Sequence, residues 1–171
     1  MQHDLDWLNT LTDDEATKEL LQCCGSKRWA SGVAISRPYS DLETLFATAD
    51  DLWWELDRSD WLEAFRSHPK IGEQKAADKV SAQSQQWSGQ EQSGVSNASN
   101  EATSTLTALN HDYEQKFGFI FIICATGKTS DEILAALRER LQHDPEAELP
   151  IAAEEQSQIT ELRLKKLLTS S

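Results

Sequence analysis

Signals for the start of an α-helix recur along this chain and argue against a fold built on a β-sheet. Each is a serine or threonine followed three residues later by a glutamate, the pattern of a capping box, and they begin at Thr12, Ser40, Ser88 and Thr129. A long apolar stripe with helical spacing consists of Ala102, Leu106, Leu109, Tyr113 and Phe117. Seven glycines and four prolines are too few for a β-rich protein with many tight turns. We therefore predict a predominantly helical fold.

Residues 117–125 are the clearest exception to the helical pattern. The run is short, aromatic and β-branched, so propensity alone predicts a buried strand, although no other segment offers a convincing partner strand. Pro150 suits the first turn of a last helix that reaches about Leu168. The length of 171 residues fits a single domain with a core of its own.

The acidic composition excludes several classes of partner. A formal net charge of −13 argues against binding to nucleic acid or to an anionic membrane surface. The same charge would repel a small anionic substrate, so a site for one must carry its own positive group. The longest apolar run is too short to span a bilayer, and the acidic N-terminus lacks the pattern of a secretory signal. Three cysteines, two of them adjacent, do not make a disulfide framework, and the whole indicates a soluble cytoplasmic domain.

The segment around His68 is distinctive because a proline follows the histidine at the end of an expected helix. Residues 60–67 have helical apolar spacing, and Pro69 disfavours α geometry at the residue before it, which predicts a helix end near Ser67. His68 is then held in an extended or bridge conformation at a helix C-terminus, where the partial negative charge favours a protonated ring. The simpler alternative is an ordinary turn that stops the helix and leaves its histidine exposed.

Residues 73–99 differ in composition from the rest of the chain. Serine, glutamine, alanine and glycine dominate, so we expect the segment either to hold short helices or to line a site. Two interpretations apply to Glu91. In one, it closes the expected capping box by accepting a hydrogen bond from the Ser88 amide. In the other, the same helix start offers its amides to a polar ligand.

Arg163 lies inside the apolar stripe of the last expected helix, with Ile159 four residues before it and Leu167 four residues after it. A guanidinium among core residues needs a partner, which is either an internal carboxylate or a ligand, although many such arginines are structural or reach solvent. The four histidines are scattered, and the sequence contains no zinc, nucleophile-elbow, phosphate-loop or dinucleotide motif. Nothing in the sequence therefore requires a metal or an organic cofactor.

Several motifs follow one another in a defined order. They are Ser67-His68-Pro69-Lys70-Ile71-Gly72, then Ser88-x-x-Glu91-Gln92, then Asn110-x-x-Tyr113-x-x-Lys116-Phe117-Gly118-Phe119 with Phe121-Ile122-Ile123-Cys124, and finally Leu162-Arg163-Leu164. This arrangement resembles the OHCU decarboxylase family, the 2-oxo-4-hydroxy-4-carboxy-5-ureidoimidazoline decarboxylases of urate degradation. Arg37-Pro38-Tyr39 and Arg140-Leu141 fit the same family. The resemblance covers nearly the whole chain, roughly residues 11–168.

The resemblance implies an all-α fold, a single compact multi-helix domain over residues 1–171, with no metal and no organic cofactor. It implies decarboxylation of the ureidoimidazoline to (S)-allantoin and CO2, with His68 and Glu91 as the catalytic residues. It also replaces the strand expected at residues 117–125 by a buried connector that runs into a helix. The positions that hold the substrate in the family match Pro69, Ser88, Gln92, the backbone near Ile123, and Arg163.

Two rival functions stay open at this point. The first is a non-catalytic acidic helical binding module in which the His68 turn only ends a helix. The second is a hydrolase that acts on the same ureido ring with much the same pocket. Six tryptophans leave room for an apolar face through which two copies of the chain could pair as a homodimer.

Overall fold

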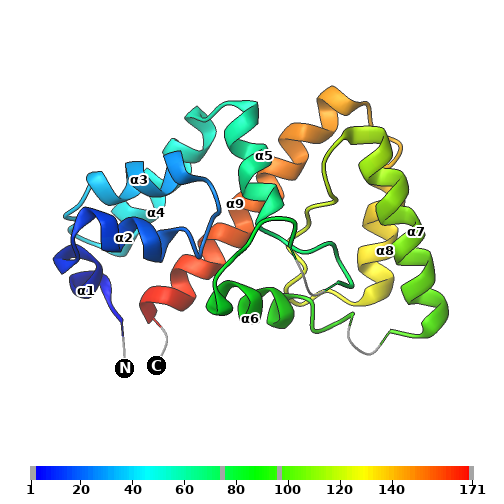
Figure 1. Ribbon diagram of the computed structural model, residues 1–171, viewed down its shortest axis with the longest axis horizontal. Helices are drawn as coiled ribbons and strands as arrows, with labels where there is room; N and C mark the ends of the chain where they lie inside the picture. Colours follow the sequence, from blue (N-terminus) through cyan, green and yellow to red (C-terminus); the bar gives the residue numbers. More distant parts are fainter. Residues whose placement is uncertain (1–2, 74–75, 96–97, 170–171) are drawn as a thin grey trace. The chain divides into compact units, whose positions relative to one another are not determined.

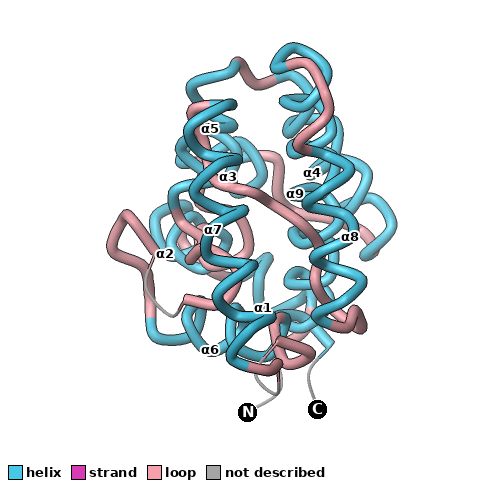
Figure 2. The backbone as a smooth tube through the Cα atoms, turned by 90° about the vertical axis from the view of Figure 1, so that its right-hand side faces the viewer, coloured by secondary structure: helices cyan, strands magenta, loops and turns pink. Residues whose placement is uncertain are grey.

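A computed structural model describes residues 3–73, 76–95 and 98–169 as helices joined by turns and loops (Figure 1; Figure 2). The helices are α1 (Leu5–Thr10), α2 (Asp13–Leu20), α3 (Lys27–Ile35), α4 (Leu42–Glu55), α5 (Arg58–Arg66), α6 (Ala82–Glu91), α7 (Asn100–Phe117), α8 (Ser130–Arg140) and α9 (Pro145–Thr169). These described residues contain no strand, and one isolated antiparallel bridge joins Pro69 and Ala76. The all-α prediction is confirmed. Within the same part of the chain, no helix combines the length and the apolar character needed to cross a membrane.

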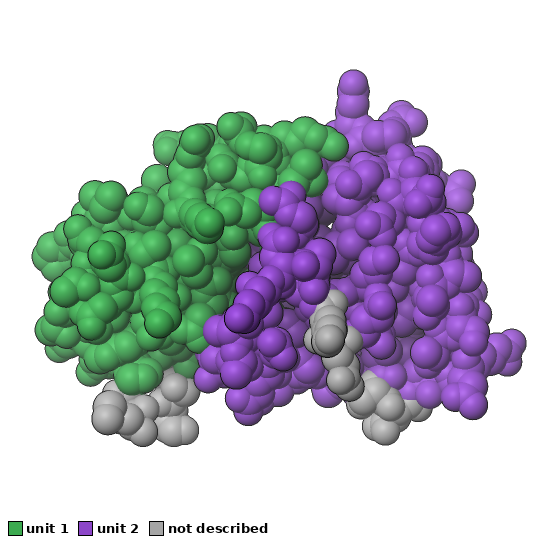
Figure 3. Space-filling view, viewed as in Figure 1, with its two compact units in different colours: residues 1–64, 157–171 green, residues 65–156 purple. Residues whose placement is uncertain are grey.

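Contacts divide the chain into two compact units, which Figure 3 colours separately. Unit 1 comprises Met1–Ala64 and Ser157–Ser171, and unit 2 comprises Phe65–Gln156. The boundaries fall inside helices, so α5 and α9 each contribute residues to both units. A single domain that extends over residues 1–171 stays a prediction.

Unit 1 is built from helices around buried aromatic and aliphatic side chains. α2 packs against α3, and α3 packs against α4. Trp29 is fully buried, and its indole nitrogen donates a hydrogen bond to the Ala49 carbonyl oxygen over 2.9 Å. This bond satisfies the polar end of a large apolar side chain, which allows the whole ring to lie in the core.

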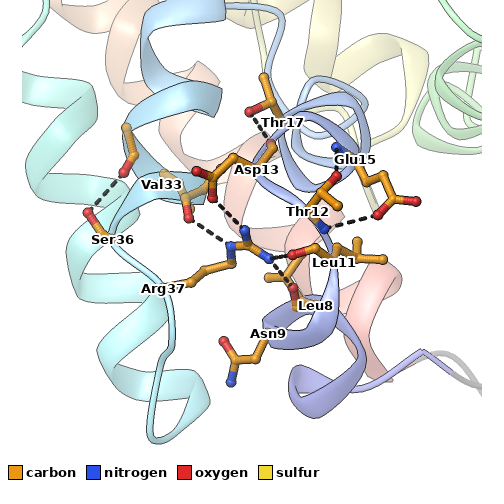
Figure 4. A network of polar contacts seen from close by, with 12 residues as sticks. Leu8, Asn9, Leu11, Thr12, Asp13, Glu15, Thr17, Val33, Ser36 and Arg37 are labelled. Carbon is orange, nitrogen blue, oxygen red and sulfur yellow. Dashed lines mark hydrogen bonds and ion pairs between the residues drawn. The ribbon is translucent and has the colours of Figure 1, made fainter.

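Arg37 connects several segments of unit 1 (Figure 4). Its Nη1 donates to the carbonyl oxygens of Leu8 and Leu11 over 2.6 and 2.7 Å, and its Nε donates to that of Ala34 over 2.7 Å. Nη2 lies 2.8 Å from a carboxylate oxygen of Asp13. The guanidinium therefore supplies donors to carbonyl oxygens at the ends of α1 and α3, where intrahelical donors run out.

Unit 2 packs α7 against α8 beside an aromatic cluster. The ring centroids of Tyr113 and Phe117 lie 4.5 Å apart, and the Phe121 ring meets the Tyr113 ring edge-on. The helical stripe predicted between Ala102 and Phe117 is confirmed, since these residues lie on α7. Gly118 ends it at φ 83°, in the left-handed region that glycine adopts without a Cβ clash.

Residues 118–129 form a connector, and the strand predicted from propensity at residues 117–125 is wrong. The backbone of the connector bonds to side chains where a strand would bond to a neighbouring strand. Arg140 Nη1 donates to the Ile122 carbonyl oxygen over 2.5 Å, and the Cys124 amide donates to a Glu155 carboxylate oxygen over 3.1 Å. The buried connector that the family resemblance implied is confirmed, and it runs into α8.

The first residues of the helices show which of the predicted capping boxes form. The capping boxes predicted at Thr12 and Thr129 are present, since each hydroxyl accepts from the amide three residues on and the glutamate there accepts from the amide of the cap. The box predicted at Ser40 is wrong. The neighbouring Asp41 caps α4, because its carboxylate accepts a hydrogen bond from the amide three residues on.

The last helix begins earlier than predicted. α9 starts at Pro145, so Pro150 lies inside the helix and not in its first turn. Pro145 occupies the first helical position, where an amide hydrogen would have no intrahelical partner and its absence costs nothing. The earlier start brings Glu148 into the helix, which the sequence pattern had left outside it.

Candidate active site

His68 lies in a turn directly after α5, as the proline behind it predicts. α5 ends at Arg66, and the His68 amide donates to the Phe65 carbonyl oxygen over 3.1 Å. His68 is buried, with 7% of the residue exposed, so the alternative of an exposed histidine in a helix-stop turn is wrong. Its Nε2 lies 2.7 Å from Oε1 of Gln156 on α9. A buried histidine with a fixed hydrogen-bond partner can exchange a proton from one defined ring orientation.

A cavity of about 550 Å³ opens beside this turn in unit 2. Three of the substrate-binding residues that the resemblance implied line it, namely Pro69, Ser88 and Gln92. The other lining residues are Gly72, Glu73, Gln85, Gln86, Gly89, Val95 and Thr103. The walls therefore come from the turn after His68, from α6 and its C-terminal end, and from α7. Their amide and hydroxyl groups suit a small ligand with many hydrogen-bonding atoms.

Ser88 and Glu91 come from the last turn of α6, and the capping box predicted between them is wrong. The helix starts at Ala82, and the Ser81 hydroxyl caps it by accepting from the Ser84 amide over 3.1 Å. The backbone amides without an intrahelical acceptor therefore lie in the first turn of α6. The interpretation that a helix start at Ser88 offers its amides to a polar ligand is also wrong. Ser88 and Glu91 are instead two buried polar residues placed one turn apart on the same helix face.

Gln92 joins the end of α6 to the turn that follows His68. Its Oε1 accepts a hydrogen bond from the Gly72 amide over 2.8 Å. Gly72 has a φ of 93°, a left-handed conformation that a side chain would strain. Because the amide oxygen is engaged, a hydrogen bond from Gln92 to a ligand would come from its Nε2.

Ile123 lies in the connector, and the peptide groups on both sides of it are held by charged side chains. The carbonyl before it is bound by Arg140 of α8, and the amide after it is bound by Glu155 of α9. The Ile123 side chain is buried. The backbone that the resemblance assigns to substrate binding therefore has a defined orientation.

Glu148 is the fully buried acid that supports Arg140. Its Oε2 lies 2.7 Å from Arg140 Nε and also accepts a hydrogen bond from the Tyr113 hydroxyl, while its Oε1 lies 2.9 Å from His143 Nδ1. Burial raises the pKa of the Tyr113 hydroxyl, which therefore stays protonated and donates. Glu148 thus neutralises Arg140 and accepts hydrogen bonds from three side chains, which offsets the cost of burying its charge.

Arg163 belongs to unit 1, whereas the other predicted site residues belong to unit 2. It is 1% exposed, as its place in the apolar stripe predicts. Its Nη1 donates to the Gln22 carbonyl oxygen over 3.1 Å. A backbone carbonyl is a third kind of partner beside the carboxylate and the ligand that the sequence suggested. Substrate binding by Arg163 stays a prediction.

The family model of the OHCU decarboxylases matches residues 9–165. The chain belongs to the OHCU decarboxylase family. It is 41% identical over 148 residues to the uric acid degradation bifunctional protein TTL of Arabidopsis thaliana, in a match that covers 86% of this chain and 45% of that protein. It is 34% identical over 144 residues to the 2-oxo-4-hydroxy-4-carboxy-5-ureidoimidazoline decarboxylase of Mus musculus, with 81% and 78% covered. This chain therefore spans less than half of the Arabidopsis protein.

A solved structure also resembles this member of the OHCU decarboxylase family. It is a crystal structure of an OHCU decarboxylase in the presence of (S)-allantoin, 40% identical in sequence, with a TM-score of 0.75. The match covers 90% of this chain and 99% of that one. The observed arrangement of helices is therefore shared with an experimentally determined member of the family.

Gln156 and Glu148 were not predicted as site residues in this OHCU decarboxylase family member. Both lie with Ala152 on one face of α9 at spacings of four residues, and all three are fully buried. The signal that pointed to Arg163, a polar residue within an apolar helical stripe, also applies to Gln156. Glu148 could not be recognised in the same way, because the predicted helix began at Pro150 and left Glu148 outside it.

Proposed function

We propose that this chain decarboxylates 2-oxo-4-hydroxy-4-carboxy-5-ureidoimidazoline (OHCU) to (S)-allantoin and CO2 in the degradation of urate. One observation carries the proposal: in a chain of this family, Pro69, which directly follows the buried His68, lines a cavity together with Ser88 and Gln92. The names of the relatives agree with it, since one is a uric acid degradation protein and one structure was obtained in the presence of (S)-allantoin.

The chemistry of OHCU explains why amino-acid side chains can catalyse its decarboxylation without a cofactor. Its carboxylate sits on a carbon next to a C=N bond, so the electron pair of the breaking C–C bond enters that imine. Many decarboxylases obtain such an electron sink from a cofactor. We therefore propose that neither a metal nor an organic cofactor takes part. The protein has to orient the ring, stabilise the charge that develops on nitrogen and oxygen, and deliver a proton to one face.

His68 is the proposed acid–base group, and Glu91 is the second catalytic residue. An imidazole changes charge near neutral pH, which suits a group that gives or takes a proton during turnover. Glu91 holds the hydroxyl or the ureido group of the substrate. The remaining contacts to substrate in unit 2 come from Pro69, Ser88, Gln92 and the backbone near Ile123.

Arg163 is the proposed source of positive charge for an anionic substrate, which a chain of net charge −13 needs. We propose that it binds a carbonyl or ureido oxygen. A contact with the departing carboxylate alone would stabilise the ground state more than the transition state, and would not accelerate the reaction.

A cytoplasmic location and the pairing of two copies through an apolar face complete the proposal. The three cysteines are buried and are not joined in disulfides with one another, as expected in a reducing compartment. Ile35 and Trp54 are large apolar side chains on the surface of unit 1, 67% and 38% exposed. Light scattering after size-exclusion chromatography of the purified chain tests for a dimer.

Circular dichroism of allantoin formation tests the activity. Urate oxidase and hydroxyisourate hydrolase generate the unstable OHCU in the cuvette, and the (S)-allantoin signal is followed with and without this chain. We expect rapid formation only with the chain, and its loss in His68→Asn. A trace no faster than spontaneous decay overturns the proposal.

Release of CO2 separates the proposal from its rivals. Decarboxylation gives CO2 together with the (S)-allantoin signal. Ring opening without CO2 would indicate a hydrolase, and neither product would leave a helical binding module.

A further inference from the structure

We propose that Gln156 fixes the ring tautomer of His68, so that the neutral ring carries its hydrogen on Nε2. Oε1 of Gln156 lies 2.7 Å from Nε2 of His68, within the range of a hydrogen bond. An amide oxygen can only accept a hydrogen bond, so the ring nitrogen must donate. Gln156 is therefore a positioning residue, which acts on the reaction through the histidine.

Burial makes this bond decisive for the tautomer. Gln156 is fully buried, and only 7% of His68 is exposed. The other neutral tautomer would place an unprotonated Nε2 against the amide oxygen, so that two acceptors would face each other away from water. An unsatisfied buried polar group costs more than an ordinary hydrogen bond contributes, so this tautomer is disfavoured.

The backbone that carries Gln156 is itself held in place within unit 2. Glu148, two turns earlier on the same face of α9, bonds to Arg140 of α8 and to Tyr113 of α7. Glu155, the residue before Gln156, accepts a hydrogen bond from the Cys124 amide. These bonds orient this segment of α9, and the Gln156 amide is thereby held opposite the ring.

The tautomer determines which ring atom exchanges the proton. A neutral ring with its hydrogen on Nε2 takes up a further proton at Nδ1, so the geometry assigns Nδ1 of His68 as the atom that gives or takes the proton. Gln156 is uncharged, so it orients the ring without the negative charge by which a carboxylate would stabilise the cation. This catalytic consequence rests on the proposed decarboxylase function, whereas the tautomer itself does not.

Nitrogen-15 NMR of the full chain, labelled in the histidine rings, tests the tautomer directly. The signals of His68 are those that disappear in His68→Asn, and a pH series identifies the neutral ring. We expect a protonated Nε2 and an unprotonated Nδ1. A wild-type ring with its hydrogen on Nδ1 overturns the proposal, because the amide would then present its nitrogen to His68. The measurement needs no activity, so it is independent of the test of the proposed function.

A pair of glutamine variants then tests the role of the amide. Gln156→Met keeps the length of the side chain and removes the acceptor, and Gln158→Met makes the same change at an exposed position of α9. We expect Gln156→Met to mix the tautomers and to lower kcat about tenfold with little change in KM, as for the loss of one hydrogen bond. Gln158→Met should change neither. A folded Gln156→Met with the wild-type tautomer overturns the proposal, and if that variant does not fold, the wild-type spectrum decides.

Discussion

The two units differ in how much of their backbone lies outside helices. In unit 1, short turns join the helices between residues 5 and 64, whereas the described part of unit 2 contains longer non-helical stretches, at residues 67–73 and 76–81 after α5 and at residues 118–129 after α7. His68, Pro69 and Ile123 lie on these stretches. A helix pairs most of its backbone amides and carbonyls within itself. A loop presents its backbone and side chains to a ligand, and its own amides and carbonyls need hydrogen bonds from other groups. In unit 2, Gln92 binds the Gly72 amide after His68, and Arg140 binds the Ile122 carbonyl oxygen before Ile123.

Arg37 of unit 1 and Arg140 of unit 2 allow the two units to be compared through the same kind of side chain. Arg37 binds three backbone carbonyl oxygens and an acid, and Arg140 binds the Ile122 carbonyl oxygen and an acid, each within its own unit. The acid beside Arg37 is Asp13, whose side chain is 72% exposed, whereas the acid beside Arg140 is Glu148, whose side chain is 0% exposed. Water screens the first pair and is excluded from the second. The same kind of arginine contact should therefore contribute very differently to the stability of the two units.

Removal of the buried acid should have the largest effect. Glu148→Gln keeps the size of the side chain but leaves the buried Arg140 without its counter-charge. We expect the free energy of unfolding to fall by about 3–5 kcal/mol, measured by urea denaturation. The matched change in unit 1, Asp13→Asn, should cost less than about 1 kcal/mol. Equal losses in the two variants would contradict the comparison.

His68→Asn should remove most of the activity without unfolding unit 2. We expect kcat to fall on the order of 10²-fold or more, as for a positioned acid–base group, in the allantoin assay. His111→Asn, a change at an exposed histidine of α7, is the matched control and should leave turnover unchanged. Turnover close to wild type in His68→Asn would rule out proton transfer by this residue.

Arg163→Ala tests whether unit 1 only supports the fold. Loss of a charged hydrogen bond to substrate should raise KM by about tenfold or more. Tm should also fall, because the side chain is buried and bonded to the Gln22 carbonyl. The half-exposed Lys165, paired with Glu161 on the same helix, gives the control Lys165→Ala. A sharp fall in Tm with an unchanged KM would show that Arg163 is structural.

The matched capping boxes should give the smallest effects. Thr12→Ala in unit 1 and Thr129→Ala in unit 2 remove the same hydroxyl from the same local geometry. Each should lower the free energy of unfolding by about 1 kcal/mol in urea denaturation. A much larger loss in one unit would mean that its helix start also supports tertiary contacts.

Acid should weaken both boxes. Hydrogen bonds from the amide and hydroxyl of Thr12 lower the pKa of Glu15 below its ordinary value of 4.5, and those of Thr129 do the same for Glu132. Because the folded pKa lies below the unfolded one, the stabilisation is fully present above about pH 4.5 and is lost as the pH falls through the folded pKa. Glu15→Gln and Glu132→Gln should therefore differ from wild type at neutral pH and approach it as the pH falls through the folded pKa in parallel denaturation curves. A difference that does not depend on pH would contradict this account.

Local chemistry accounts for what could be predicted from the sequence. The apolar stripe of α7, the capping boxes at Thr12 and Thr129, and the end of α5 before Pro69 each depend on residues a few positions apart. The errors arose where several local signals were available. Asp41 caps α4 in place of Ser40, and Ser81 caps α6, well before Ser88. A local pattern shows that a cap can form, but it does not select among neighbouring caps.

The residues of the candidate site likewise fall into those that sequence motifs indicated and those that only the tertiary structure brought together. The motif resemblance supplied His68, Glu91 and the proposed substrate contacts, because motifs are visible in the order of residues along the chain. Only the tertiary structure paired His68 with Gln156, and only it placed Arg140 and Glu155 on the peptide groups beside Ile123. These pairs join residues far apart in the sequence. Whether two polar groups meet away from water depends on how helices pack, and no local pattern of residues contains that information.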